Sequence, residues 1–365
     1  MRTEPPVPSE ALAQIRGALA AAGATAVDAP ILQPLNLLLD LAGEAMRARL
    51  FVVQGEGGAE ACLRPDFTVA VARRHIEGGA AAGRYAYEGP AFRSAPEGDR
   101  PEEFVQLGVE LFAPAGGSTV EADAEVAGLA WRAAVAGGRS DLTLWLGDVS
   151  LFAAFIETLS LPEALAARLK RVAGRPRLLN AELARAGEAP ARAGAGQLAA
   201  MLSGLSETQA AALLEEVWAL AGIEPVGGRG PLEIAARLVR RAEAASAPAL
   251  SEQQAAAIRA FMAISEAPAV ALKQVRGLAG QGRALEAALA ELPAGRMRFA
   301  PALGHAFDYY DGLTFEVRSA ALGDDRPVAS GGRYDGLLAR LGGATDARAV
   351  GCVVRPWRAY AGGEA

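Results

Sequence analysis

The stretch "FVQLGVELF", residues 104–112, alternates in polarity with a period of two, which is typical of a β-strand with two different faces. One face is apolar and carries Val105, Leu107, Val109 and Leu111. The other face carries Gln106 and Glu110, about 13 Å apart along the strand, with Gly108 between them. Because glycine has no side chain to block this space, we expect the second face to form the floor of a ligand-binding site.

A second alternating segment, "RYAYEG" at residues 84–89, precedes this strand, and a turn-rich loop separates the two. The arrangement predicts a β-hairpin over residues 84–112.

Helical patterns lie upstream at residues 9–22, with Ser9 as the N-cap, and in the stretch that ends at Gly78-Gly79. Further strands are predicted at "LTLWLGD", "RMRFAPAL", "LTFEV", "RPVAS" and "AVGCVV". This mixture of elements predicts an α+β fold.

The domain organisation follows from where the strand signals stop and resume. Capping boxes at Ser118 with Glu121 and at Ser251 with Gln254 mark the starts of two helices. Strand patterns occur before and after residues 150–293, but this stretch itself is almost wholly helical in pattern. We therefore predict one discontinuous domain, residues 1–149 and 294–365, interrupted by a mainly helical insertion at 150–293.

Composition excludes several classes of protein. Hydrophobic residues make up 52% of the 365 residues, yet no apolar run approaches the roughly 18 to 20 residues that a membrane span needs. The N-terminal "MRTEPPVPSE" has prolines and acids where a secretory signal has basic and then apolar residues. We expect a cytoplasmic protein with no membrane partner.

Charge and cysteine content argue against a nucleic-acid or metal partner. The net charge of −6 provides no overall attraction for phosphates, so we expect no nucleic-acid partner. Cys62 and Cys352 are far apart in sequence and neither has a second cysteine or a histidine at a metal-binding spacing. We expect both to be free, buried thiols and expect no metal or other cofactor.

The two histidines occur in different contexts. His75 falls near the end of a predicted helix, where we expect a surface or helix-end residue rather than a ligand. His305 lies in "GHAFDYYDGLTFEV", residues 304–317, which gathers five polar residues around it: Asp308, Tyr309, Tyr310, Asp311 and Glu316. His305 is either a catalytic base or a position where chemistry has been lost.

Several motifs, taken in order, are similar to the histidyl-tRNA synthetase catalytic domain. "DYYDGLTFEV" and "SGGRYDGLL" carry the resemblance together, and "LRPDFT", "YEGPAFR" and "EFVQLGVELF" add to it. "VDAPILQP" resembles the dimer-forming first motif of class II synthetases. The resemblance covers residues 1–149 and 296–358, and it implies an antiparallel sheet flanked by helices, a homodimer formed through the first motif, and an amino-acid pocket.

The resemblance also implies which residues line that pocket. Asp66 and Thr68 match positions that hold the α-amino group of the amino acid, and Arg93 matches the arginine that contacts its carboxylate and the ATP α-phosphate. The remaining matches surround the imidazole of histidine. The full set is Asp66, Thr68, Arg93, Gln106, Glu110, Tyr309 and Tyr310.

Departures from the family pattern fall in the ATP site. His305 replaces an arginine that serves the activated phosphate, and a mostly neutral imidazole cannot reproduce a guanidinium. Glu102 replaces a triphosphate-binding arginine with the opposite charge, which should repel ATP. Arg355 and Trp357 align with a small glycine and a glutamate, while Arg358 matches a retained arginine. We expect no catalytic residues and a degenerate ATP site.

The sequence ends at Ala365, so we expect no anticodon-binding domain. A retained amino-acid pocket without the ATP cations or a tRNA reader is similar to the regulatory subunits of ATP phosphoribosyltransferase. That resemblance implies a protein without aminoacylation activity that binds L-histidine. It also implies a hetero-oligomer with the short-form catalytic subunit, which the regulatory subunit activates in the first step of histidine biosynthesis and places under histidine feedback.

Two other interpretations remain open. The chain could be a truncated histidyl-tRNA synthetase-like enzyme that activates an amino acid, an interpretation favoured by Arg93 and Arg358. It could also be a binding module for a ligand other than histidine, because Asp66 stands where the family more often has glutamate.

Overall fold

The structure is a computed structural model. It describes residues 2–42, 44–55, 60–95, 100–116, 119–173, 176–187, 205–221, 234–235, 249–268, 271, 294–301, 303 and 309–363. The chain divides into two compact units, one formed by Met1–Leu151 with Met262–Ala365 and the other by Phe152–Phe261. His305 and Ser118, which the sequence analysis singled out, lie outside the described residues.

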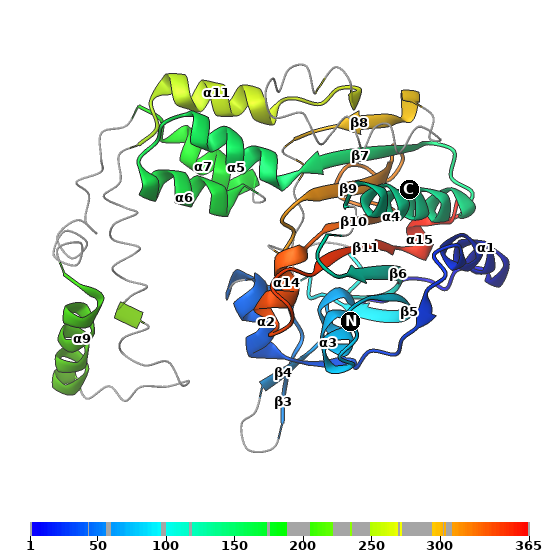
Figure 1. The fold of residues 1–365 in the computed structure, drawn as a ribbon, viewed down its shortest axis with the longest axis horizontal. Coiled ribbons are helices and arrows are strands. Elements are labelled where there is room, and N and C mark those ends of the chain that lie inside the picture. The colour runs from blue at the N-terminus through cyan, green and yellow to red at the C-terminus, as the bar shows by residue number, and fades with distance from the viewer. Residues whose placement is uncertain are drawn as a thin grey trace. The chain divides into compact units, whose positions relative to one another are not determined.

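The first unit is built on an eight-stranded sheet with the order β1-β5-β6-β11-β10-β9-β7-β8 (Figure 1). Its central pairings are all antiparallel, whereas the edge pairs β1 with β5 and β7 with β8 are parallel. The strands are β1 (Thr25–Ala26), β5 (Gly83–Phe92), β6 (Glu103–Ala113), β7 (Leu142–Asp148), β8 (Met297–Phe299), β9 (Leu313–Ser319), β10 (Ala329–Arg333) and β11 (Arg348–Val354). The predicted α+β fold and the hairpin at 84–112 are confirmed, with parallel edges added to the expected antiparallel sheet.

One face of this sheet packs against α1 (Ser9–Ala20) and α4 (Thr119–Ala136). Helix α4 contacts β10 and β11, and its buried alanines allow the backbones to approach closely. The apolar face predicted for residues 104–112 lies in this core, where Leu107, Val109 and Leu111 are buried, although Val105 at the end of the row is 40% exposed.

A second apolar cluster lies beside the opposite face. It includes residues of α2 (Leu35–Ala42), α3 (Thr68–Glu77) and α14 (Asp335–Arg340). Five aromatic rings, of Phe67, Tyr87, Phe112, Tyr309 and Tyr334, are buried in it. The polar residues predicted for the ligand site therefore share their face of the sheet with a substantial apolar core.

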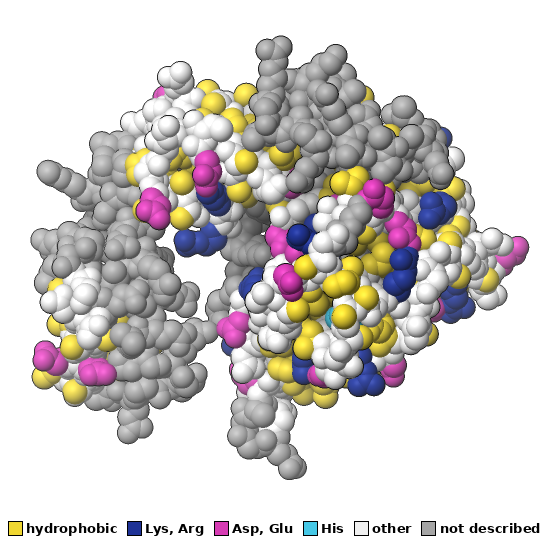
Figure 2. Space-filling view, in the orientation of Figure 1, with side chains coloured by type: hydrophobic (Ala, Val, Ile, Leu, Met, Phe, Trp, Pro, Cys, Tyr) yellow, Lys and Arg dark blue, Asp and Glu magenta, His cyan; other side chains and the backbone are white. Residues whose placement is uncertain are grey.

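A separate three-stranded antiparallel sheet has the order β2-β4-β3, with β2 at Leu32–Pro34, β4 at Glu60–Leu63 and β3 at Val52–Gln54. Short 3-10 helices occur at Glu44–Arg49 and Ala294–Arg296, and the short helix α15 at Pro356–Ala359 follows β11. On the visible face in Figure 2, the described acidic and basic side chains of this unit are interspersed with apolar ones.

The described part of the second unit is helical. Its helices are α5 (Val149–Thr158), α6 (Glu163–Val172), α7 (Pro176–Ala184), α9 (Glu207–Ala221) and α11 (Glu252–Met262). The capping box before α11 is confirmed, because Gln254 N lies 3.2 Å from Ser251 Oγ and Ser251 N lies 3.0 Å from Gln254 Oε1. The exact division into residues 1–149 with 294–365 and 150–293 stays a prediction.

The structure confirms the predictions for the two cysteines and differs from those for Ser9 and His75. Cys62 and Cys352 are free and buried, as expected. Ser9 is the first residue of α1 rather than its cap, and Pro8 at the cap position has no side-chain hydrogen bond to offer. His75 lies in the last turn of α3 as predicted, but it is buried rather than on the surface, stacked 4.4 Å from the Phe112 ring. No helix of the described ranges is long and apolar enough to cross a bilayer.

Candidate functional site

The polar side chains of β6 point to the sheet face opposite α4. Glu110 pairs across the strands with Tyr85 on one side and Gly351 on the other. A β-carbon at Gly351 would overlap Glu110 Oε2, so the carboxylate lies directly over β11 in the space that this glycine leaves. Gly351 in turn pairs with Gly332 of β10, where a β-carbon would lie 2.9 Å from the Tyr310 ring. Small residues in the sheet thus make room for the polar groups above it.

The space over Gly108 is different, and the predicted open floor is wrong in this detail. Tyr87 pairs directly with Gly108, and its ring fills the space where a β-carbon would stand. Tyr87 Oη donates a hydrogen bond to Cys352 O at 3.3 Å, and its ring stacks on Phe67 at a centroid distance of 4.4 Å. Glycine at this position accommodates an aromatic side chain of the neighbouring strand, so no open space remains there.

Glu110 is a buried carboxylate with partners from two helices. Thr68 Oγ1, at the start of α3, donates to Glu110 Oε1 at 2.8 Å, and Tyr334 Oη, just before α14, donates to Glu110 Oε2. Only 1% of Glu110 is exposed. Burial raises the pKa of Glu110 to about 8 because a charge is costly away from water, while the hydrogen bonds from Tyr334 and Thr68 act in the opposite direction.

Two further polar groups of the site are buried with unused acceptor atoms. Asp66 Oδ2 accepts a hydrogen bond from Tyr309 Oη at 3.3 Å, and the backbone amides of Thr68 and Val69 also lower the pKa of Asp66. Asp66 Oδ1 nevertheless has no hydrogen bond of good geometry from the described residues. The same is true of Gln106 Oε1, in a residue that is 1% exposed. Leaving a buried acceptor unsatisfied costs about 1 to 3 kcal/mol, so these atoms indicate where the donors of a ligand would bind.

Three tyrosines enclose this region. The ring centroids of Tyr309 and Tyr310 are 4.8 Å apart, and Tyr334 contacts both at 5.8 and 6.2 Å. Burial raises the pKa of each phenol above its usual value, so all three are neutral hydroxyl groups. The sequence motifs pointed to Tyr309 and Tyr310 but not to Tyr334, although Tyr334 lies in "SGGRYDGLL" at residues 330–338.

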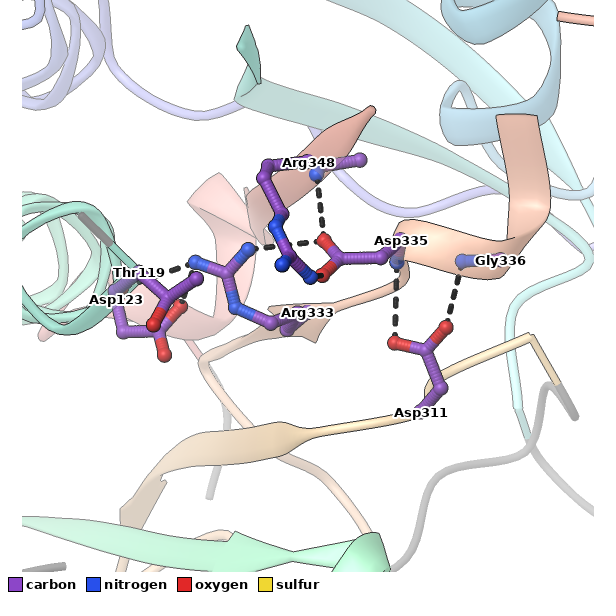
Figure 3. Close-up of polar contacts among 8 residues, drawn as sticks. Thr119, Asp123, Asp311, Arg333, Asp335, Gly336 and Arg348 are labelled. Atoms are coloured by element: carbon purple, nitrogen blue, oxygen red, sulfur yellow. Dashed lines mark hydrogen bonds and ion pairs between the residues drawn. The ribbon is translucent and has the colours of Figure 1, made fainter. Parts of the chain in front are cut away.

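A network around Arg333 positions these tyrosines (Figure 3). Arg333 binds Asp123 of α4 at 2.5 Å and Asp335 of α14 at 2.9 Å. Asp311, next to the two tyrosines, accepts hydrogen bonds from the backbone amides of Asp335 at 3.0 Å and Gly336 at 2.6 Å. The first amides of α14 are therefore occupied by a carboxylate of the chain itself, so this glycine-rich loop serves to fix the tyrosine segment.

The described residues of the predicted ATP site lie near the start of β6 and the end of β11. Arg93 Nε donates to Pro65 O at 2.9 Å, and its charge lowers the pKa of Asp66 against the larger effect of burial. The guanidinium groups of Arg93 and Arg355 lie 5.4 and 3.6 Å from the centroid of the Phe104 ring. Arg93 thereby links the histidine-like pocket to this second region.

Glu102, Trp357 and Arg358 have distinct surroundings. Glu102 accepts hydrogen bonds from the backbone amides of Arg2 at 3.1 Å and Ala95 at 3.4 Å, which lower its pKa, the Arg2 amide having the largest effect. Trp357 is half-buried, with its ring 6.2 Å from that of Tyr360. Arg358 donates to Pro327 O at 3.0 Å.

Comparison with known proteins shows the family to which the chain belongs. The family described as histidyl-tRNA synthetase matches residues 8–228 and 229–356. An ATP phosphoribosyltransferase regulatory subunit from Mesorhizobium japonicum is 38% identical over 361 residues, covering 93% of this chain and 93% of the relative. The chain belongs to the family of ATP phosphoribosyltransferase regulatory subunits. A member from Brucella ovis with the same name is 34% identical over 355 residues, covering 92% of this chain and 93% of its own.

Solved structures show the same fold at lower identity. An ATP phosphoribosyltransferase regulatory subunit/histidyl-tRNA synthetase from Bacillus halodurans has a TM-score of 0.62 at 22% identity, covering 97% of this chain and 78% of its own. A histidine–tRNA ligase subunit from Alicyclobacillus acidocaldarius has a TM-score of 0.59 at 20% identity, covering 98% and 94%. The predicted family and its class II synthetase-like fold are confirmed.

The raised pKa of Glu110 predicts a dependence of stability on pH. Because this pKa is about 8 in the folded protein against 4.5 for a free glutamate, the folded state holds an extra proton between these values, and its stability falls as pH rises through them. Glu110→Gln removes the charge, so we expect it to be more stable than the natural chain at pH 8 by about 1 to 3 kcal/mol and equal to it near pH 4.5.

Urea denaturation across this pH range measures the difference. Glu216→Gln, at an exposed glutamate of α9, is the control and should follow the natural chain at every pH. Parallel curves for Glu110→Gln and the natural chain would show that Glu110 is ionised throughout.

Proposed function

We propose that this protein is a regulatory subunit that binds L-histidine in the pocket formed by Asp66, Thr68, Arg93, Gln106, Glu110, Tyr309 and Tyr310. The observation that supports this most directly is the pair of buried acceptors, Asp66 Oδ1 and Gln106 Oε1, which have no donor among the described residues. Histidine offers an ammonium group and an imidazole N–H, which are donors that these atoms lack. The family membership supports the same ligand, because the matching synthetases are named for histidine.

Each end of the amino acid has a suitable partner. The ammonium group would bind Asp66 and Thr68, and Arg93 would face the carboxylate, where a guanidinium can form two parallel hydrogen bonds. The imidazole would lie among the tyrosines, within reach of Gln106 and Glu110. Glu110 is already held by Thr68 and Tyr334, so the pocket is organised before the ligand arrives.

We infer that the chain has no aminoacylation activity of its own and assembles in the cytoplasm with the short-form catalytic subunit of ATP phosphoribosyltransferase. That subunit joins ATP and phosphoribosyl pyrophosphate in the first step of histidine biosynthesis. Histidine would act as a feedback inhibitor if its affinity differed between the active and inactive assemblies. The names of the relatives support the regulatory role.

Reconstitution with the catalytic subunit tests this role. Co-expression of both chains should yield a complex with ATP phosphoribosyltransferase activity that neither chain has alone, and L-histidine should inhibit it.

The retained Arg93 and Arg358 favour a second candidate, an amino-acid-activating enzyme. Robust ATP–pyrophosphate exchange by the purified chain with histidine would overturn the regulatory role in favour of that enzyme.

Gln106 allows the pocket to be tested without loss of folding. Gln106→Leu keeps the volume of the side chain and removes the unsatisfied acceptor. We expect histidine binding, measured by calorimetry, to weaken by about 1 to 3 kcal/mol while the free energy of unfolding stays equal or rises. Gln253→Leu, at an exposed glutamine of α11, should change neither quantity. If Gln106→Leu bound histidine with unchanged affinity, the histidine site would lie elsewhere in the protein.

We also propose a homodimer formed through the small sheet. Four apolar residues on or beside it are exposed: Ile31 (45%), Leu32 (54%), Val52 (38%) and Val53 (38%). The first two belong to the stretch that resembles the dimer-forming motif. The strand register places Leu32 and Val53 on one face of the small sheet and Val52 on the other. An exposed apolar strand face is typical of protein interfaces.

A single charge should disrupt this interface. Leu32→Glu places a carboxylate where an apolar contact is proposed, and we expect light scattering to show a monomer in place of a dimer at micromolar concentration. Leu178→Glu, at a leucine of α7 with a similar exposure of 48%, is the matched control and should remain dimeric. A dimer that survives Leu32→Glu would place the interface on another surface.

A further inference from the structure

Arg64 is a buried arginine whose hydrogen bonds join separate segments of the chain. It follows β4 directly, and only 3% of it is exposed. Its Nη1 donates to Ala29 O, its Nε donates to Pro90 O at 2.8 Å, and its backbone amide donates to Ile31 O at 2.8 Å. All of these acceptors are backbone oxygens, so Arg64 fixes the course of the main chain in the segments that it joins.

Two of these oxygens belong to the stretch at residues 27–34, which we propose forms the dimer. The side chain of Ile31 is 45% exposed and lies in the proposed interface, whereas its backbone oxygen accepts the hydrogen bond from Arg64. The strand register adds a second connection, since Leu32 pairs with Leu63, the residue before Arg64. A change in the course of the interface strand therefore moves Arg64.

On its other side, Arg64 is connected to the histidine-like pocket through a short, stiff segment. Only Pro65 separates it from Asp66, and the proline ring fixes one of the two backbone angles of that link. The Arg64 guanidinium also lies 3.9 Å from the centroid of the Phe67 ring, and Phe67 precedes Thr68 at the start of α3. The pocket residues Asp66 and Thr68 thus follow Arg64 with few free angles between them.

Gly89 of β5 leaves the space that Arg64 occupies beside the sheet. A β-carbon at Gly89 would lie 2.8 Å from Arg64 Nη2 and 3.2 Å from Phe67 Cζ, so a larger residue would displace the guanidinium. Gly89 pairs with Gln106, one of the predicted pocket residues. Phe67 stacks on Tyr87, also of β5, at a centroid distance of 4.4 Å. Arg64 is therefore held against the sheet next to the pocket as well as against the interface strand.

We propose that Arg64 is a positioning residue that couples the dimer interface to the histidine pocket, so that dimer formation and histidine binding strengthen each other. Because it needs a histidine site and a homodimer, this coupling rests on the proposed function. The two equilibria are linked: if the dimer binds histidine more tightly than the monomer does, histidine stabilises the dimer by the same factor for each site. The histidine concentration thereby controls the assembly state of the protein.

The natural chain and a monomeric variant measure the coupling with Arg64 in place. Calorimetry should show that the monomer produced by Leu32→Glu binds histidine about fivefold more weakly than the natural dimer, whereas the control Leu178→Glu should bind it as tightly as the natural dimer. In sedimentation equilibrium, saturating L-histidine should lower the dimer dissociation constant of the natural chain by about 25-fold, the square of the effect at one site.

The outcomes of these measurements separate the coupling from the proposed function. Equal histidine affinity of monomer and dimer, with no shift of the dissociation constant, would overturn the coupling and leave the histidine site intact. No histidine binding by the natural chain would overturn the proposed ligand and the coupling together.

Substitution of Arg64 tests whether the coupling passes through this side chain. Arg64→Lys keeps the positive charge, but its single ammonium group cannot reproduce the fixed fork that reaches Ala29 O and Pro90 O. We expect histidine to shift the dimer dissociation constant of this variant by less than about twofold, although it still binds histidine and still dimerises. Arg139→Lys is the matched control and should keep the full shift, because Arg139 is 8% exposed and likewise donates to backbone oxygens.

A neutral variant extends the test if Arg64→Lys folds poorly. Burial lowers the pKa of Arg64, against a raising effect of the charge of Asp28, so the buried charge is itself unfavourable. Arg64→Gln removes this charge and can donate to only one of the two oxygens at a time, and we expect it to lose the histidine-dependent shift as well. A shift of the natural size in either folded variant would overturn the positioning role of Arg64 and leave the histidine site unaffected.

Discussion

Arg333 is the side chain on which the arrangement of the site most depends. It is buried and charged, so it requires the carboxylates of Asp123 and Asp335, and these come from helices α4 and α14. The same arginine thus ties a helix on one face of the sheet to the start of a helix that borders the site. Asp311 extends the connection to the tyrosine segment. A core packed only with apolar side chains would not define this geometry so closely.

The pocket combines groups that are fully satisfied with groups that are not. Both carboxylate oxygens of Glu110 accept hydrogen bonds, one from Thr68 and one from Tyr334, so the position of this side chain over the sheet is fixed. Asp66 and Gln106 each keep one buried acceptor without a partner in the described structure. Buried polar groups of proteins are normally paired, so this division separates the residue that the chain itself holds from those that we propose bind the ligand.

The parts of the fold and of the candidate site that could be predicted are those that depend on neighbouring residues in the sequence. Alternation along residues 104–112 correctly assigned Leu107, Val109 and Leu111 to the core and Glu110 to the other face, because strand periodicity is a property of adjacent residues. Gly108 was misjudged because its space is filled by Tyr87 from the neighbouring strand. Tyr334 was missed for a related reason. Its partner Glu110 is more than two hundred residues away in the chain, and no local signal reports such a contact.

The position of β11 in the sheet has a consequence for biosynthesis. Strand β6 pairs with β5, the strand that precedes it in the chain, but its other neighbour is β11, so that Leu107 lies opposite Val354. During translation the hairpin emerges long before its second partner, and the long-range pairing makes folding of the sheet slow. Until β11 arrives, one edge of β6 is an open template for strands of other molecules. The nascent chain is therefore exposed to aggregation over this interval, and this exposure is set by the order of strands rather than by the stability of the finished fold.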